Sequence, residues 1–346
     1  MYDSILAREI HEQPDVVRTL LEMESENVAR ITADLRGRFH YVVIAARGTS
    51  DNAARYAQYL FGAHNQLQVA LATPSLFSLY NRPPNLSGAL VIGISQSGQS
   101  PDIVSVLAEG KRQGCPTVSI TNDTASRLAQ AADYVIPLHA APETAVAATK
   151  SYTASLAALA LISGMFASNQ DHLHDLERIP ALMELTFDAQ QDAMRHVERY
   201  VFMEHCAVLG RGYNYSTTFE VALKIKELNR VVAEPYSSAD FRHGPIATVS
   251  NGFPVLLVAP RGAISEDIAD LVARLKRLQA EMIVISDDQA LLRQANLALP
   301  IPEGIPEWLT PLVAVLPGQM FAMQLTKEKG LNPDQPEGLT KVTETL

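Results

Sequence analysis

Hydrophobic and polar positions follow two periods along the chain, and the change from one to the other predicts its elements. Residues 8–35 carry apolar side chains at helical spacing, and Pro14 suits the first turn of a helix. Short apolar runs then alternate with helical patterns over residues 39–61, 68–73, 89–114, 116–123 and 134–138. Strands that alternate with helices predict βαβ units, so we expect a parallel sheet covered by helices on both faces.

The same order of elements recurs in the second half of the chain. After helical patterns over residues 173–202, residues 205–228 again show an apolar run, a glycine-containing turn and a helix. Residues 254–288 match residues 89–123 in length and in the order of their patterns. This duplication predicts an α/β fold of two similar doubly wound parallel-sheet halves in tandem, joined by helices. The expected divisions are a helical segment 1–30, a first domain 31–170, a helical linker 171–198, a second domain 199–330 and a tail 331–346.

Composition and charge narrow the class of protein. With 346 residues, 47% hydrophobic and 19% charged, the chain has the make-up of a soluble globular protein with room for two domains. Its formal net charge of −10 argues against nucleic acid or an anionic membrane as the main partner. Acidic residues near the start argue against a signal peptide, and the longest small-apolar stretch, 155–168, is too short to span a membrane. We therefore expect a cytoplasmic protein.

The sequence argues against a disulfide framework and against a metal site built from cysteines or histidines. Only two cysteines occur, Cys115 and Cys206, too few for a disulfide framework or a thiolate cage. His172 and His174 are two positions apart and diverge on a helix, so we expect both at the surface. Neither a metal nor an organic cofactor is predicted.

Hydroxyl groups gather where an apolar run gives way to a helical pattern, in residues 94–102, ISQSGQSPD. Such a strand-to-helix turn presents free backbone N–H groups and the positive end of a helix dipole. Ser100 suits the N-cap position and Pro101 the first helical position, but a cap needs only one hydroxyl. The full set of neutral donors suits phosphate oxygens: Ser95, Gln96, Ser97, Ser100 and the backbone at Gly98.

A second hydroxyl-rich turn strengthens the phosphate interpretation. Residues 47–51, RGTSD, also end an apolar run and open a helix, and they add Thr49 and Ser50. The loop 94–102 carries no lysine, and neither the P-loop nor the dinucleotide fingerprint occurs, which argues against nucleotides. The alternative for one such loop is a polar turn with a single cap, but two in one half favour a phosphate monoester site.

These stretches resemble a known family. Residues 46–56, 94–102 and 142–156, with the duplicated layout, are similar to the sugar isomerase (SIS) family over nearly the whole chain. The resemblance is greatest to the isomerase portion of glucosamine-6-phosphate synthase and to stand-alone amino-sugar-phosphate deaminases and isomerases. It implies flavodoxin-like halves and a sugar-phosphate substrate. It also implies that the phosphate is bound by Ser50, Ser95, Gln96, Ser97 and Ser100, and that the backbone of Val146 contacts the sugar.

Glu220, Lys224 and Glu227 fall on one face of a helical pattern, at i, i+4 and i+7. One interpretation is a solvated stripe of ion pairs. The other is chemical, because moving a proton between C1 and C2 of a sugar needs a carboxylate base and a cation for the enediolate charge. Through the resemblance, Glu227 matches the proton-transfer glutamate and Lys224 an active-site lysine, while Glu220 resembles a sugar-contacting or structural partner.

Two further residues carry proposed chemistry. The imidazole of His243, in the loop-like stretch DFRHGP, suits proton exchange with a sugar oxygen, although a lone histidine can equally be structural. Through the resemblance, His243 opens the sugar ring and reaches the site of a neighbouring subunit, which implies a homodimer. Lys341 lies in a polar tail that could be disordered. The resemblance makes it a lysine that closes over the sugar and can engage its carbonyl, which would need a neutral amine.

The chain also departs from the synthase. Arg47 precedes the Gly-Thr-Ser turn, where the synthase has a small thiol residue, and Ala148 stands where the synthase has a serine. Both features look more like the stand-alone deaminases. The isomerase-like opening follows Met1 closely, so we expect no glutaminase domain.

Together these features predict an amino-sugar-phosphate deaminase/isomerase that converts glucosamine 6-phosphate to fructose 6-phosphate and ammonia, or runs the reverse with ammonia. Close alternatives act on another sugar 6-phosphate, such as galactosamine 6-phosphate, or cleave a sugar–amine conjugate as a deglycase. A non-catalytic sugar-phosphate sensor is a different class. Glu227, His243 and Lys341 together argue against the sensor, since a binding module needs neither a base nor a ring opener.

Overall fold

The computed structural model describes residues 3–341, which form two compact units. The first-sheet unit comprises residues 12–144 and 148–178 with the described tail residues 340 and 341. The second-sheet unit comprises residues 3–11, 145–147 and 179–339. Each unit contains one five-stranded sheet in which the paired strands are all parallel. The predicted α/β fold with two similar halves is therefore confirmed.

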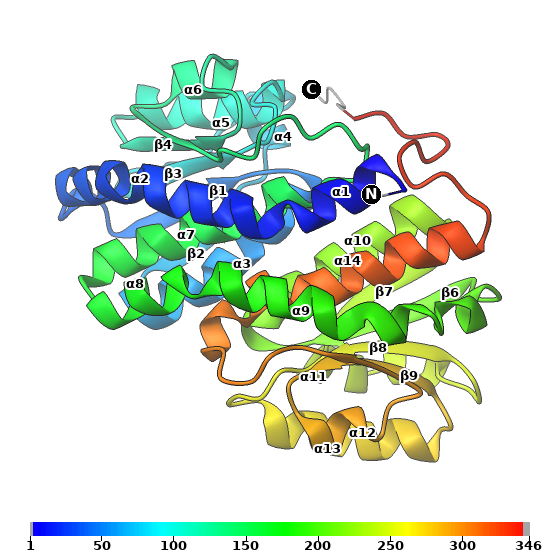
Figure 1. Cartoon of the computed structure of the whole chain (residues 1–346). Coiled ribbons are helices and arrows are strands. Elements are labelled where there is room, and N and C mark those ends of the chain that lie inside the picture. Colours follow the sequence, from blue (N-terminus) through cyan, green and yellow to red (C-terminus); the bar gives the residue numbers. More distant parts are fainter. Residues whose placement is uncertain (1–2, 342–346) are drawn as a thin grey trace. The chain divides into compact units, whose positions relative to one another are not determined.

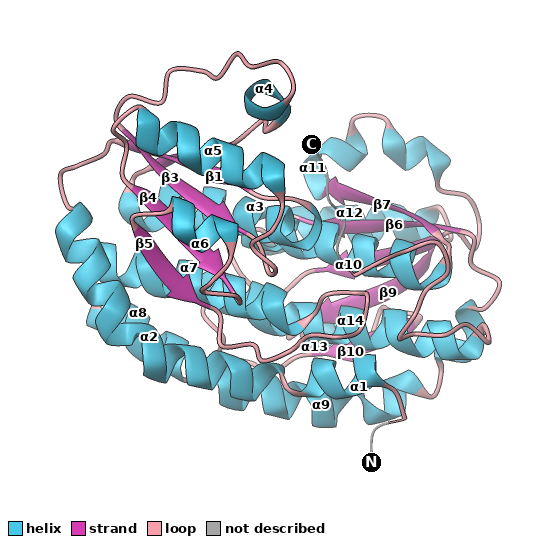
Figure 2. Ribbon diagram, turned by 90° about the horizontal axis from the view of Figure 1, so that it is seen from above, coloured by secondary structure: helices cyan, strands magenta, loops and turns pink. Residues whose placement is uncertain are grey.

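The first sheet is open and has the strand order β2-β1-β3-β4-β5. Its strands are β1 (Tyr41–Ala45), β2 (Gln68–Leu71), β3 (Ala89–Ile94), β4 (Thr117–Thr121) and β5 (Tyr134–Pro137). Of these, β3, β4 and β5 lie side by side in Figure 2. All residues of β3 and β4 are buried. The direction of winding reverses between β1 and β3, which are neighbours with Ala45 beside Gly93. Ligands of doubly wound folds bind beyond the carboxyl ends of the strands at such a point.

Helices cover both faces of this sheet (Figure 1). They are α2 (Gln13–Leu35), α3 (Gly48–Asn65), α4 (Ser75–Ser78), α5 (Pro101–Arg112), α6 (Arg127–Ala131), α7 (Lys150–Ala167) and α8 (Gln170–Glu177). Both α2 and α3 pack against α7, which is buried from Lys150 to Gly164. On the other face, Val91 of β3 belongs to a core cluster with Leu107 of α5 and Leu128 of α6. The small-apolar stretch 155–168, too short to span a membrane, thus lies in the core helix α7 and its C-cap.

The second sheet repeats the strand order of the first, read from the opposite edge as β10-β9-β8-β6-β7. Its strands are β6 (His205–Gly210), β7 (Val232–Ser237), β8 (Pro254–Val258), β9 (Glu281–Ser286) and β10 (Leu297–Pro300). The helices of this unit are α1 (Ile5–His11), α9 (Ile179–Met194), α10 (Tyr215–Asn229), α11 (Ser238–Arg242), α12 (Ser265–Arg277), α13 (Gln289–Leu292) and α14 (Thr310–Glu328). Short 3-10 turns are η1 (Val197–Tyr200), η2 (Gly212–Asn214), η3 (Pro245–Thr248) and η4 (Glu307–Leu309).

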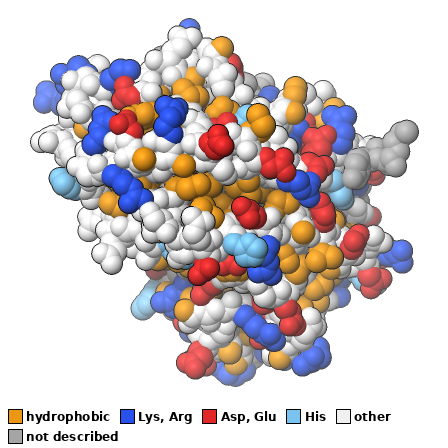
Figure 3. All heavy atoms as spheres, turned by 60° about the vertical axis from the view of Figure 1, so that its left-hand side comes forward, with side chains coloured by type: hydrophobic (Ala, Val, Ile, Leu, Met, Phe, Trp, Pro, Cys, Tyr) orange, Lys and Arg blue, Asp and Glu red, His pale blue; other side chains and the backbone are white. Residues whose placement is uncertain are grey.

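The long helix α14 is the centre of the second-sheet unit. It packs against α9 and α10, and a Cβ at Gly318 would lie 2.4 Å from Cγ2 of Val221, so only glycine permits this approach to α10. The segment Glu307–Glu328 is apolar and long enough to cross a membrane, but 94% of its most apolar window is buried inside the protein. That burial is typical of a core helix. On the face shown in Figure 3, acidic and basic side chains are interspersed.

Candidate active site

Two hydroxyl-rich turns lie at the winding reversal of the first sheet, as the sequence predicted. The turn after β1 leads directly into α3, and Thr49 and Ser50 lie in the first turn of that helix. Arg47 occupies the N-cap position, and the left-handed φ of 52° at Gly48 favours glycine there. The second turn follows the neighbouring strand β3 and leads into α5.

The hydroxyls of the second turn have different local tasks. Ser95 is almost fully buried, and its Oγ accepts a hydrogen bond from the backbone N–H of Gly98 at 3.1 Å. The Oγ of Ser97 accepts a longer one from the N–H of Gln99 at 3.4 Å. Ser100 takes the predicted N-cap position of α5, but its side chain makes no capping hydrogen bond. Helix capping therefore does not account for the Ser100 hydroxyl.

Gly98 allows the second turn to fold tightly. Its φ is 61°, and a Cβ there would lie 2.1 Å from Oγ of Ser126. Any side chain at this position would displace the turn. Gln96 lies half-buried between the two serines at 95 and 97, and its backbone carbonyl accepts a hydrogen bond from Asn122 at 3.1 Å.

An ion pair that the sequence analysis missed joins the two turns. Nε of Arg47 lies 2.8 Å from Oδ2 of Asp102, whose side chain is fully buried in the first turn of α5. Arg47 is half exposed, so its guanidinium extends from the buried carboxylate to the surface. In the sequence, Arg47 stands out only as the residue that replaces a small thiol residue. The one local signal for its partner was an aspartate beside the serine cluster.

The polar face of α10 is buried, so the solvated-stripe interpretation is wrong. The side chains of Glu220 and Lys224 are 0% and 1% exposed, whereas Glu227 is 24% exposed. Nζ of Lys224 lies 3.4 Å from Oε1 of Glu220 and 2.6 Å from Oε2 of Glu227. One buried ammonium group therefore contacts two carboxylates, and only Glu227 presents surface that a substrate can reach.

His243 is exposed at the C-cap of the short helix α11. The carboxylate of Asp267 in the first turn of α12 holds this helix at both ends. It accepts a hydrogen bond from Ser238 Oγ at 2.6 Å, and Arg242, next to His243, forms an ion pair with it. Nη1 of Arg211 lies 2.9 Å from the same carboxylate. Partial burial opposes ionisation, but the hydrogen bonds from Arg242, Ser238 and Arg211 outweigh it and lower the pKa of Asp267 to about 2.

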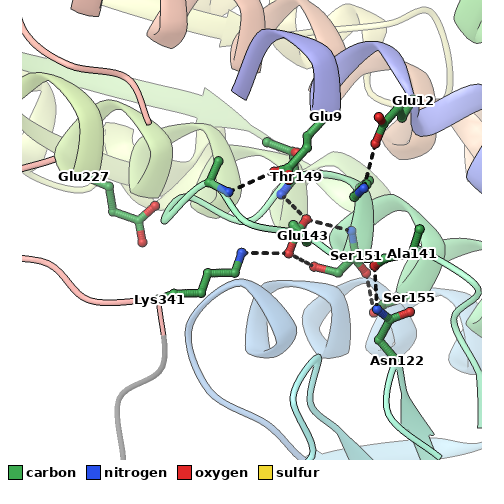
Figure 4. Close-up of polar contacts among 12 residues, drawn as sticks. Glu9, Glu12, Asn122, Ala141, Glu143, Thr149, Ser151, Ser155, Glu227 and Lys341 are labelled. Carbon is green, nitrogen blue, oxygen red and sulfur yellow. Dashed lines mark hydrogen bonds and ion pairs between the residues drawn. The ribbon is translucent and has the colours of Figure 1, made fainter. Parts of the chain in front are cut away.

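Lys341 and Val146 lie in different units. The tail places Lys341 Nζ 3.0 Å from Oε2 of the buried Glu143, within the first-sheet unit (Figure 4). In the second-sheet unit, the backbone N–H of Val146 donates to the carbonyl of Asp334 at 3.3 Å. Sequence reasoning missed Glu143, although it lies in the quoted stretch 142–156. Its signal was a single acid among small and apolar residues.

Several other polar candidates are accounted for by structure. Lys150 is 2% exposed and pairs with Glu12 at 2.6 Å, within the first-sheet unit. Both cysteines are buried and unpaired with each other, and burial raises the pKa of the Cys206 thiol to about 12. Trp308 is buried. Within residues 3–341 no group of three or more His, Cys, Asp or Glu side chains could hold a metal ion.

The fold and these groups define the protein as a tandem of two doubly wound α/β domains with hydroxyl-rich turns at the switch point of the first. The chain belongs to the SIS domain family, whose model matches residues 39–163 and 203–327, one match in each half. The resemblance predicted from the turns is thus confirmed.

Proteins similar to this chain carry the names of aminotransferases and phosphosugar isomerases. Glutamine–fructose-6-phosphate aminotransferase of Aquifex aeolicus is 32% identical over 98% of this chain. The chain spans 57% of that relative's length. A crystal structure from Silicibacter pomeroyi DSS-3, provisionally named a phosphosugar isomerase, is 32% identical with a TM-score of 0.86, covering 96% of this chain and 100% of that one.

A third solved structure shows the same fold at lower identity. Glucosamine-6-phosphate deaminase of Thermotoga maritima has a TM-score of 0.79 and is 21% identical, covering 99% of this chain and 100% of that one. At this identity the likeness concerns the fold alone.

Proposed function

We propose that this protein is an amino-sugar-phosphate deaminase/isomerase that converts glucosamine 6-phosphate and water to fructose 6-phosphate and ammonia, or runs the reverse reaction. The observation that carries the proposal is the Lys224–Glu227 pair on α10. A partly exposed carboxylate beside a fully buried ammonium group provides a base together with a fixed positive charge. Proton transfer between C1 and C2 needs both.

Each group has a role in this reaction. Glu227 takes the proton from C2 of the open-chain sugar and returns it to C1, while Lys224 stabilises the negative charge on O1 of the enolamine intermediate. Water then hydrolyses the C2 imine, which releases ammonia and leaves the ketone of fructose 6-phosphate. Because Lys224 is held between two carboxylates, its position is set before the substrate arrives, which reduces the reorganisation that the reaction requires. Ring opening is assigned to His243, whose exposed side chain suits use by a neighbouring subunit in a homodimer.

The phosphate group is assigned to the two turns of the first sheet. Both turns begin helices, so backbone N–H groups and helix dipoles add to the hydroxyl donors Thr49, Ser50, Ser97 and Ser100. Ser95 and Gln96 complete the predicted set. Glu220 is fully buried against Lys224, so we assign it the structural role rather than a sugar contact.

The proposal is tested by measuring ammonia and fructose 6-phosphate released from glucosamine 6-phosphate. Glu227→Gln should remove at least about two orders of magnitude of kcat, the usual contribution of a general base. The matched control is Glu234→Gln, an exposed glutamate on β7. Release by the Glu227 variant at the wild-type rate would contradict the proposal. Binding of the sugar phosphate without turnover would point to another amine substrate, a deglycase or a sensor.

A further inference from the structure

Glu143 is a buried carboxylate at the start of a long helix. It lies in the segment between β5 and α7, and its side chain has no exposed surface. It accepts hydrogen bonds from the backbone N–H groups of Thr149 at 2.9 Å and Ser151 at 3.1 Å, and from Ser151 Oγ at 2.8 Å. Thr149 is the N-cap of α7 but provides no capping side chain. The carboxylate of Glu143 therefore caps α7 from outside the helix, at the end where the helix dipole favours negative charge.

A fourth donor comes from far along the chain. Nζ of Lys341 lies 3.0 Å from Oε2 of Glu143, and the two residues are 198 positions apart (Figure 4). Burying a carboxylate is costly unless a cation and hydrogen-bond donors compensate. Burial here opposes ionisation of Glu143, but Lys341 and the donors at the start of α7 outweigh it and lower the pKa of this carboxyl. Three donors belong to α7, so Lys341 is the one described donor that can leave without unfolding the helix.

We propose that Glu143 is the positioning residue for Lys341, and that it binds the ammonium group and holds the described tail residues 340 and 341 against the start of α7. The contact between Glu143 and Lys341 does not depend on the proposed function. Only the catalytic role of Lys341 rests on that function. A lysine held in this way has a defined place. To engage a carbonyl, its amino group must first leave Glu143.

The contact can be tested without any substrate, by trypsin. Trypsin takes the lysine side chain into its own pocket, so cleavage after Lys341 requires that Lys341 first leaves Glu143. Glu143→Gln keeps the shape of the side chain but removes its charge, and cleavage after Lys341 should become about tenfold faster, as expected for loss of a coupled ion pair. Equal rates in the wild type and the variant would overturn the proposal.

A matched control separates this effect from a general loosening of the unit. Glu24 is also buried in the first-sheet unit, where its carboxylate contacts His139 and Asn27. Glu24→Gln should leave cleavage after Lys341 at the wild-type rate.

If Glu143→Gln does not fold, Lys341→Gln tests the same contact by acid unfolding. Without Lys341 the pKa of Glu143 rises, so stability should be lost at a higher pH than in the wild type or in the exposed control Lys276→Gln. An unchanged acid transition would overturn the proposal.

A double-mutant cycle then links the contact to catalysis. If Glu143 acts through Lys341, Glu143→Gln lowers kcat in the wild type but by less than about twofold in a Lys341→Gln background. A merely structural role would lower kcat equally in both backgrounds, and that result would overturn the positioning role. If no sugar phosphate is turned over, the proposed function fails, whereas the trypsin measurement still decides whether Glu143 holds Lys341.

Discussion

Nε of Arg47 donates to the buried carboxylate of Asp102 at 2.8 Å, and this contact joins the two hydroxyl-rich turns of the first sheet. The second half of the chain repeats it, because Arg211 contacts Asp267 at 2.9 Å. Asp102 and Asp267 occupy the same place in the duplicated stretches 89–123 and 254–288. The two pairs hold different segments. The pair in the first half joins two turns, whereas Asp267 of the second pair also contacts both ends of α11, the helix that His243 follows.

Removing the cation of the first pair should destabilise the protein. Arg47→Gln leaves the buried carboxylate of Asp102 without this partner, and we expect a loss of about 1–2 kcal/mol in the free energy of unfolding. This range lies below that for a fully buried pair, because Arg47 is half exposed. Urea unfolding measures the loss.

The double variant Arg47→Gln/Asp102→Asn provides the control for this prediction. Since it removes both charges, it should recover part of the stability that Arg47→Gln loses. If the double variant loses as much stability as Arg47→Gln and Asp102→Asn lose together, the ion pair does not couple the turns.

The hydroxyls assigned to the phosphate should affect substrate binding more than the chemical step. Ser97→Ala or Ser100→Ala should raise KM for glucosamine 6-phosphate about tenfold with kcat nearly unchanged, because a phosphate contact is equally present in the ground and transition states. Ser105→Ala on α5 is the matched control, since Ser105 Oγ donates to the carbonyl of Asp102 at 2.6 Å. A fall in kcat at constant KM would contradict the assignment.

Local periodicity was sufficient to predict the elements and the duplication, because strands and helices bury side chains at different spacings. Spacing also placed Glu220, Lys224 and Glu227 on one face of a helix, and the structure brings them into contact. The spacing of these residues could not predict that Glu220 and Lys224 are buried. Whether a polar helix face is solvated depends on what packs around the helix, here including α14, whose close approach to α10 requires Gly318.

The long-range partners could not be predicted for a related reason. Glu143 and Lys341 are 198 residues apart, and Arg47 and Asp102 are 55 apart. No local period relates such positions, and only the completed fold brings them together. In the sequence, Glu143 is a single acid among small and apolar residues, and Asp102 is an aspartate beside a serine cluster. Neither signal identifies the distant partner.

Asp267 should contribute stability with a definite dependence on pH. Its pKa is about 2 in the folded protein, against about 3.9 for an unperturbed aspartate in the unfolded chain. The contribution is therefore present above about pH 4 and is lost as the pH falls towards 2, and its full size is about 2–3 kcal/mol. Urea unfolding of the wild type and Asp267→Asn at several pH values measures it. The difference between the two should shrink on acidification.

Asp270→Asn is the matched control for this measurement, because Asp270 is an exposed aspartate on the same helix. It should behave as the wild type at every pH. The Asp267 variant should also lower kcat, since the carboxylate holds the helix that ends at His243. A variant that loses stability but keeps kcat would separate Asp267 from the proposed role of His243.

Mixed dimers test whether His243 acts in a neighbouring subunit. His243→Ala and Glu227→Gln should each be inactive alone, but a dimer with one chain of each kind contains one complete site, with Glu227 from one chain and His243 from the other. An equal mixture that exchanges subunits should therefore regain about one quarter of wild-type activity, because half of the dimers are mixed and each has one working site. Glu227→Gln mixed with Lys224→Met is the control, because both residues lie on α10 and neither mixed site is complete. A mixture as inactive as its parents would place the action of His243 within its own chain.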